Sequence, residues 1–311
     1  MKAYTSNNIR NIAVLGHGGK GKTTLCEAML YIAGASDRLG RVADGNTVLD
    51  FDSEEKRRKS SVSSAIAALE WDNTKLNIID APGLFDFEGG AAEAVRAVEA
   101  VLIVTSAGSG VDVGTEKAFR AAEKKGAAKF FAITKTDSDH RNFYKTFDAL
   151  KEVYGNKLCP TIIPYMEGNI TKCYVNLMTG MAFSYDENGK ATKVPVPEDS
   201  VIEEMTSAFM EAVATTDDAL MEKFFEGEKF TKEEILKGLC IGIFDGSIYP
   251  VYAVSGLTCA GVDQLLYGLA WSAPGAFGYA GEKCTYENGE EGILPCDENG
   301  FRQARARHRG I

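Results

Sequence analysis

The chain has 311 residues, 45% of them hydrophobic, and its 34 basic and 44 acidic side chains give a net charge of −10. This length suits one large domain or two medium ones, and the hydrophobic content suffices for a sizeable buried core. The negative charge argues against broad, non-specific binding to DNA or to an anionic membrane. No apolar stretch is long enough to span a membrane and the N-terminus lacks an apolar signal core, so we expect a cytoplasmic protein.

A glycine-rich stretch near the N-terminus carries the strongest local signal. Residues 16–23 read Gly-His-Gly-Gly-Lys-Gly-Lys-Thr, which matches the phosphate-binding pattern Gly-x-x-x-x-Gly-Lys-[Ser/Thr]. The apolar run 11–15 predicts a strand before it, and 24–33 predicts a helix after it. Such a loop turns backbone N–H groups toward an anion. We expect Lys22 to contact the β- and γ-phosphates and Thr23 to bind Mg²⁺. The residues expected to contact the nucleotide here are His17, Gly18, Gly19, Lys20, Gly21, Lys22, Thr23 and Thr24.

Strand and helix signals alternate through the first half of the chain and return near its end. This alternation predicts an α/β fold of the P-loop NTPase kind, with a mostly parallel sheet and helices on both faces. We expect strands over 62–71, 75–80, 100–105, 128–134 and 249–255. We expect helices over 91–99, 113–125, 143–154 and 262–271.

The stretch 158–248 has a different texture. It predicts a small antiparallel sheet, with short strands at 161–166, 174–177, 181–185 and 191–196 and a turn at 186–189. Helices follow, one over 200–214 and one that is capped by Thr231 and Glu234. We interpret this stretch as an inserted α+β subdomain. The nucleotide-binding domain would then comprise 1–157 and 249–275, and 276–311 would be a linker, or the start of a further domain, that we expect to be poorly ordered.

Two more motifs follow predicted strands. Asp80-Ala81-Pro82-Gly83 places a carboxylate where it can bind a Mg²⁺-ligated water, and the bare N–H of Gly83 can reach a γ-phosphate. Thr134-Lys135-Thr136-Asp137 stands where GTP-binding proteins carry Asn-Lys-x-Asp. There the Asp137 carboxylate would accept from guanine N1–H and the exocyclic amine, which adenine does not offer in that arrangement.

The base site has one departure and one addition. Thr134 cannot offer the amide of the usual Asn, which leaves open a P-loop ATPase with relaxed base choice. Lys135 would lay its stem along the base, and Ser255, Gly256 and Leu257 are placed to give a backbone N–H to guanine O6.

In their order and spacing these motifs resemble the translational GTPases, particularly elongation factor G and its elongation-factor-G-like branch. The resemblance covers about residues 9–300, and further residues that carry it are Gly40-Arg41-Val42, Asp44-Gly45, Asp50-Phe51-Asp52, Glu54-Glu55, Asn77-Ile78-Ile79 and Asp86-Phe87. It implies a Ras-like domain that binds GTP or GDP with Mg²⁺, a G′-like insertion, and a ribosomal partner. It also implies that Ser61 closes on Mg²⁺, with Ser60 and Ser63 as rivals.

The residue after Gly83 departs from this family. Elongation factor G has a histidine there that positions the attacking water, and this chain has Leu84, which can neither donate nor accept a hydrogen bond. We therefore predict slow GTP hydrolysis, with a regulatory module that binds nucleotide without turnover as the alternative. The later domains of that family have no counterpart here, so we expect an isolated, monomeric nucleotide-binding portion.

Overall fold

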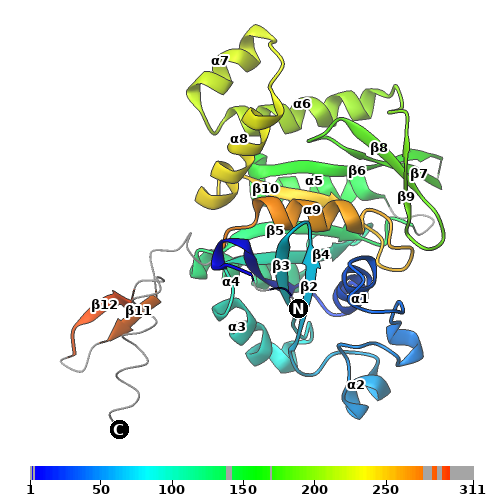
Figure 1. The fold of residues 1–311 in the computed structure, drawn as a ribbon, viewed down its shortest axis with the longest axis vertical. Helices are drawn as coiled ribbons and strands as arrows, with labels where there is room; N and C mark the ends of the chain where they lie inside the picture. The colour runs from blue at the N-terminus through cyan, green and yellow to red at the C-terminus, as the bar shows by residue number, and fades with distance from the viewer. Residues whose placement is uncertain are drawn as a thin grey trace.

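The computed structural model describes residues 2, 4–137, 142–168, 170–275, 282–285 and 289–294. One ten-stranded sheet runs through the molecule in the order β2-β3-β1-β4-β5-β10-β6-β7-β8-β9 (Figure 1). Its strands are β1 (Ile9–Leu15), β2 (Ala65–Trp71), β3 (Thr74–Asp80), β4 (Ala100–Ser106), β5 (Ala128–Thr134), β6 (Leu158–Glu167), β7 (Ile170–Asn176), β8 (Met181–Tyr185), β9 (Ala191–Val194) and β10 (Tyr249–Ala253).

The strands from β3 to β6 are parallel to one another, and antiparallel strands flank them at both edges. Every residue of β4 and β5 is buried, as expected for central strands covered on both faces. The predicted mostly parallel α/β sheet is confirmed.

Helices cover both faces of this sheet (Figure 1). On one side α1 and α9 pack against each other and against β3, and on the other α3 packs against α4, while α4 and α5 contact β5. The helices are α1 (Lys22–Ile32), α2 (Ser53–Arg58), α3 (Glu88–Arg96), α4 (Val113–Lys125), α5 (Phe143–Tyr154), α6 (Ser200–Ala214), α7 (Asp218–Glu226), α8 (Lys232–Asp245) and α9 (Val262–Ser272).

Several predicted elements have ends that are shifted by a few residues, and two of them include residues that usually interrupt an element. The helix expected over 91–99 begins at Glu88 and ends at Arg96. Its start is earlier than predicted because its first turn includes Gly89 and Gly90, and glycine usually disfavours a helix. The strand expected over 161–166 is longer at both ends, although Pro160 and Pro164 lie within it and proline usually marks the end of a strand.

The strands of the inserted stretch do not form a sheet of their own. β6 pairs in parallel with β10, and β7, β8 and β9 follow as antiparallel neighbours, so the expected small antiparallel sheet is an extension of the main one. The turn expected at 186–189 is present and Gly189 adopts a φ of 75° in it. The capping box of Thr231 and Glu234 is also present.

Beyond residue 275 the described residues form one antiparallel pair of strands, β11 (Glu282–Thr285) and β12 (Glu291–Leu294). Most of the expected linker at 276–311 lies outside the described residues. In the part of the chain that the structure describes, no helix combines the length and the apolar character needed to cross a lipid bilayer.

Candidate functional site

The glycine-rich loop joins β1 to α1, as predicted, and its packing excludes side chains at two points. A Cβ at Gly16 would collide with the carbonyl of Val104, and Gly16 has a φ of 142° that favours glycine. A Cβ at Gly83 would collide with Lys22 Nζ, which brings the turn after β3 directly against the loop lysine. Bare backbone therefore surrounds the ammonium of Lys22.

Lys22 is almost completely buried at the start of α1, with 6% of its surface exposed. Its Nζ donates to the carbonyls of Gly16 and His17, each at 3.0 Å. Burial lowers the pKa of Lys22, while the carboxylates of Asp80 and Asp50 act in the opposite direction. The loop therefore holds the Lys22 amine beside two acidic groups that favour its charged form.

A polar cavity of about 230 Å³ opens in front of this lysine. Its wall combines the glycine-rich loop, the segment between α1 and β2, the turn after β3 and the residue after β5. The lining residues are Gly18, Gly19, Gly21, Lys22, Thr23, Thr24, Val42, Asp50, Lys59, Ser60, Ser61, Gly83 and Lys135.

Two hydroxyls and two carboxylates meet at this cavity: Thr23, Ser61 and Asp50 line it, and Asp80 bonds Thr23 without lining it. Thr23 Oγ1 donates to Asp80 Oδ2 at 2.6 Å, and Ser61 Oγ donates to Asp50 Oδ1 at 2.8 Å. The two hydroxyl oxygens lie 3.0 Å apart, within hydrogen-bond distance, and either can donate to the other. Hydroxyl and carboxylate oxygens therefore gather at one point, and oxygens are the ligands that a hard cation such as Mg²⁺ prefers.

The burial of the two carboxyl groups in this cluster also favours a bound cation. Burial raises the pKa of Asp80 to about 7 and also raises the pKa of Asp50. One oxygen of each, Asp80 Oδ1 and Asp50 Oδ2, is buried without a hydrogen-bond partner. A divalent cation nearby would favour the charged forms of both groups, so the donor set fits the expected metal.

Sequence reasoning assigned no role to two of the acidic residues here. Asp50 entered only as a mark of the family resemblance, although it bonds Ser61 and lines the cavity. Glu27, fully buried in α1, accepts the N–H groups of Val48 and Leu49 at 2.8 and 2.9 Å and so ties the segment before Asp50 to the helix. A lone glutamate within the apolar run of a helix was the available signal for Glu27.

The position after Gly83 brings a hydrophobic side chain to the loop. Leu84 is 40% exposed, and a Cβ at Gly18 would lie 3.0 Å from its Cδ2. His17 does not line the cavity: its ring packs edge-to-face on Phe85 with 5.6 Å between centroids, and its Nδ1 is buried without a partner. Among the described residues that line the cavity there is no imidazole.

The predicted base-recognition motif lies beside the loop. Thr134 is 2% exposed, and its hydroxyl contacts the carbonyls of Lys20 at 2.7 Å and Thr105 at 3.0 Å, so it joins β4 and β5 to the glycine-rich loop. Lys135 has a φ of 60° and donates from Nζ to the carbonyl of Gly19 at 2.8 Å, which lays its stem across the loop. Asp137 is exposed at the end of the motif.

The second predicted base loop follows β10. Ser255 is buried, and its N–H donates to the carbonyl of Ala260 at 2.9 Å, so this amide is already engaged. Gly256 approaches α1 so closely that a Cβ would lie 3.0 Å from the carbonyl of Thr24. Leu257 is exposed, which leaves the backbone of Gly256 and Leu257 as the part of this loop that can face a base.

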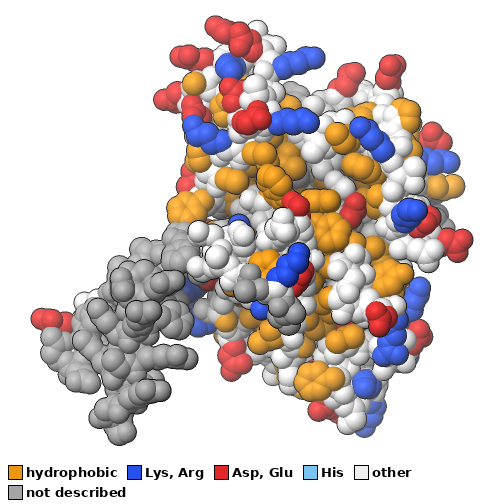
Figure 2. All heavy atoms as spheres, viewed as in Figure 1, with side chains coloured by type: hydrophobic (Ala, Val, Ile, Leu, Met, Phe, Trp, Pro, Cys, Tyr) orange, Lys and Arg blue, Asp and Glu red, His pale blue; other side chains and the backbone are white. Residues whose placement is uncertain are grey.

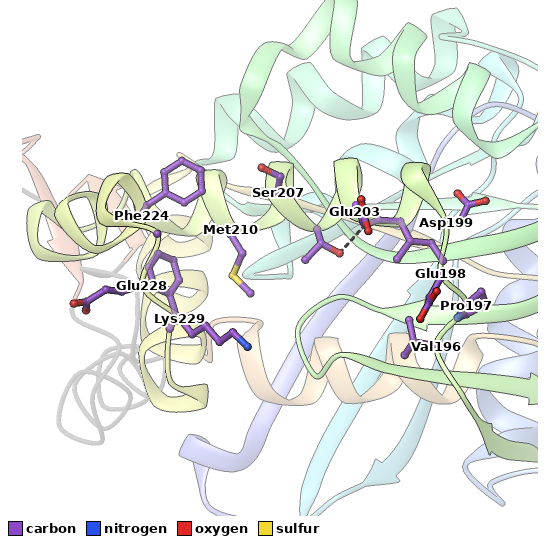
Figure 3. A pocket seen from close by; sticks show the side chains of 14 residues that line it. Val196, Pro197, Glu198, Asp199, Glu203, Ser207, Met210, Phe224, Glu228 and Lys229 are labelled. Carbon is purple, nitrogen blue, oxygen red and sulfur yellow. Dashed lines mark hydrogen bonds between the residues drawn. The ribbon is translucent and has the colours of Figure 1, made fainter.

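A second and larger cavity, of about 730 Å³, lies wholly within the inserted stretch (Figure 3). Apolar side chains such as Ile202, Met210 and Phe230 line it together with the carboxylates of Glu198 and Glu203. Acidic side chains also gather over the end of the molecule where α7 lies (Figure 2). Because carboxylates repel phosphates, this cavity is a poor candidate for the nucleotide site.

Comparison with known proteins decides the family. The model of the elongation factor Tu GTP-binding domain matches residues 7–274. The chain belongs to this family of GTP-binding domains. Membership implies guanine nucleotide binding and agrees with the resemblance to translational GTPases.

Individual members of this GTP-binding family show the same relationship. Elongation factor G-like proteins from two strains of Mycobacterium tuberculosis are each 33% identical over 261 residues, which is 83% of this chain and 36% of theirs. A Thermus thermophilus protein of known crystal structure superposes with a TM-score of 0.82 and 34% identity, over 89% of this chain and 42% of that one. The chain therefore spans little more than a third of the curated relatives' length.

Proposed function

We propose that this chain is the Mg²⁺-dependent GTP/GDP-binding domain of an elongation-factor-G-like translation protein, and that it hydrolyses GTP slowly. The single observation that carries the metal and phosphate part is the cluster of Thr23, Ser61, Asp80 and Asp50 beside Lys22. Thr23 and Ser61 would bind Mg²⁺, and Asp80 and Asp50 would hold its water ligands. Lys22 and the loop amides from Gly18 to Thr24 would bind the phosphates.

At the other end of the site, Asp137 would accept from the guanine N1–H and exocyclic amine. Lys135 would lie along the base, and a backbone N–H of Gly256 or Leu257 would donate to O6. Thr134 would contribute indirectly: its buried hydroxyl ties the base strand to the carbonyl of Lys20, so it positions the two motifs relative to each other.

Slow hydrolysis follows from what surrounds the γ-phosphate position. Phosphoryl transfer relies on positioning of the nucleophile and on charge stabilisation. The N–H of Gly83 would meet the γ-phosphate, but the hydrocarbon side chain of Leu84 cannot orient a water, and His17 is turned onto Phe85. Single-turnover hydrolysis of radiolabelled GTP should thus be far slower than for a factor with histidine at this position.

A calorimetric titration with GDP in the presence of Mg²⁺ tests the proposal, and an absence of GDP binding would refute it. The exposed Leu84 also favours a second candidate function, a regulatory module that binds nucleotide without turnover. Single-turnover measurements with and without ribosomes separate the two, because only a slow GTPase would respond to a partner by releasing phosphate.

The domain division and partners belong to the same proposal. Residues 1–157 and 249–275 would form the nucleotide-binding domain, 158–248 a G′-like subdomain whose strands extend its sheet, and 276–311 a linker. The full-length protein would act on the ribosome in the cytoplasm, and the isolated domain would be a monomer. Light scattering and ribosome co-sedimentation test these points.

A further inference from the structure

Strand β7 of the inserted stretch makes hydrogen bonds to the base-recognition motif, residues 134–137. Thr171 Oγ1, on β7, donates to the carbonyl of Thr136 at 2.9 Å. The Tyr174 hydroxyl, further along β7, lies 2.7 Å from Thr136 Oγ1. Thr136 and Tyr174 are both buried, with 3% and 4% of their surfaces exposed, whereas the neighbouring Asp137 is exposed.

The direction of these hydrogen bonds follows from the number of protons. Thr136 Oγ1 donates its only proton to the carbonyl of Val254 at 3.1 Å, so the Tyr174 hydroxyl must donate to Thr136. Burial raises the pKa of Tyr174 and outweighs the lowering by the hydrogen bond with Thr136, and the carboxylate of Asp137 also raises it, so the hydroxyl stays protonated. Because Val254 directly precedes Ser255, one chain of hydrogen bonds joins β7 to both base loops.

A second aromatic hydroxyl of the inserted strands supports the loop before α9. Tyr185, on β8, donates to Asp263 Oδ1 at 2.6 Å at the start of that helix. Its ring packs edge-to-face on Tyr174, with 5.5 Å between centroids. At the turn between β8 and β9, a Cβ on Gly189 would collide with Cys259. The inserted strands therefore contact both the base-recognition motif and the loop between β10 and α9.

We propose that Tyr174 is a positioning residue for guanine recognition, which acts through Thr136 to set the Asp137 carboxylate against the amides that follow Val254. The inference rests on the proposed guanine site. An exposed carboxylate in water is mobile, and a recognition group has to be held within about 0.5 Å of its productive place. The hydrogen bonds that Thr136 makes with Tyr174 and Thr171 provide that restraint from β7, outside the motif.

The test is the substitution Tyr174→Phe, which keeps the ring and its packing and removes the donor. Binding of GDP, inosine diphosphate and ADP is measured by titration with Mg²⁺. We expect GDP affinity to fall about 3- to 10-fold, as for the loss of one buried hydrogen bond. Inosine diphosphate lacks the exocyclic amine that Asp137 would bind, so its affinity should fall less and the preference for GDP should shrink.

Two further variants keep the test specific. Thr136→Val removes the hydroxyl that Tyr174 bonds, so it should give a similar loss of preference, and the double variant should lose little more than either single one. Tyr144→Phe is the matched control, because its hydroxyl donates from α5 to the carbonyl of Pro164 on β6 at 2.6 Å, outside both base loops. This control should keep the wild-type preference for GDP over inosine diphosphate.

The outcomes separate this inference from the proposed function. If the wild-type chain binds GDP and Tyr174→Phe leaves the preference unchanged, the inference is overturned and the proposed function stands. Equal losses for all three nucleotides, or the same loss of preference in Tyr144→Phe, would indicate general loosening and also overturn it. A wild-type chain that does not bind GDP would refute the proposed function itself.

Discussion

The two ends of the candidate nucleotide site are built in opposite ways. At the phosphate and metal end, Lys22, Thr23 and Asp80 are buried and bonded to one another or to the loop. At the base end, Asp137 and Leu257 are exposed, and what is buried is the support behind them. The first end is built mainly from residues of the predicted motifs that bond one another, and the second depends also on contacts with the stretch 158–248.

This difference predicts how each end responds to substitution. Buried groups that bond each other should show large effects and strong coupling, because the loss of one leaves another unpaired in a low-dielectric site. Exposed groups should show effects confined to the ligand that they recognise, with little change in stability.

The largest effect is expected for Lys22→Ala at the buried end. Loss of a charge-assisted contact to the phosphates should weaken GDP binding by about 100-fold or more, for GDP and ADP alike. Lys145→Ala, which removes an exposed cation on α5, is the control and should bind normally. Unchanged affinity of the Lys22 variant in a calorimetric titration would remove the loop from the account.

Asp137→Asn sharpens the contrast at the exposed end. The acceptor becomes partly a donor, so GDP affinity should fall about 100-fold while xanthosine diphosphate, whose donors and acceptors are swapped to match, should bind better than to the wild type. The melting temperature should stay within a few degrees of the wild-type value. Asp148→Asn, at an exposed site on α5, should leave both affinities unchanged.

Leu84→His tests the missing imidazole. Positioning by a suitable side chain contributes about 10² or more in rate, so single-turnover GTP hydrolysis should rise at least about tenfold, with nucleotide affinity little changed. Leu84→Asn, which is polar but cannot accept a proton at neutral pH, is the comparison. An unchanged rate with histidine would mean that another defect limits hydrolysis.

Asp80→Asn addresses the metal cluster. The Mg²⁺-dependent part of GDP affinity should fall about tenfold and approach the value measured with a chelator.

The pH dependence of the wild type tests the same cluster. The pKa of Asp80 is raised to about 7, so protons should compete with Mg²⁺, and the Mg²⁺-dependent part of GDP affinity should weaken as the pH falls below 7. A metal effect that is flat between pH 8 and 5 would contradict this role.

The sequence alone predicted the elements and motifs that depend on neighbouring residues. Residues close together in the sequence suffice to recognise the apolar run of β4, the glycines around Lys22 and the capping box of α8. Tyr174, Asp50 and Glu27 were not found, because their roles arise from contacts with residues that are remote in the chain. The same limit applies to β6, which was predicted only over 161–166 and whose pairing with β10 is set by the fold.

The smallest effect is expected for Lys59→Gly. Lys59 lines the cavity and ends α2 with a φ of 54°, a conformation that costs a non-glycine residue about 1 kcal/mol. Glycine should therefore raise the melting temperature by a few degrees. Loss of an exposed positive charge should lower GTP affinity about threefold. If thermal melts show destabilisation instead, Lys59 makes stabilising contacts that outweigh its backbone strain.

The most direct measurement of the central claim is a side-by-side titration of the wild-type chain with GDP and ADP, each with Mg²⁺ and with a chelator. The account predicts tight GDP binding that weakens when Mg²⁺ is removed, and ADP binding weaker by about 100-fold or more. Equal affinity for the two nucleotides, or GDP binding that ignores the metal, would contradict it.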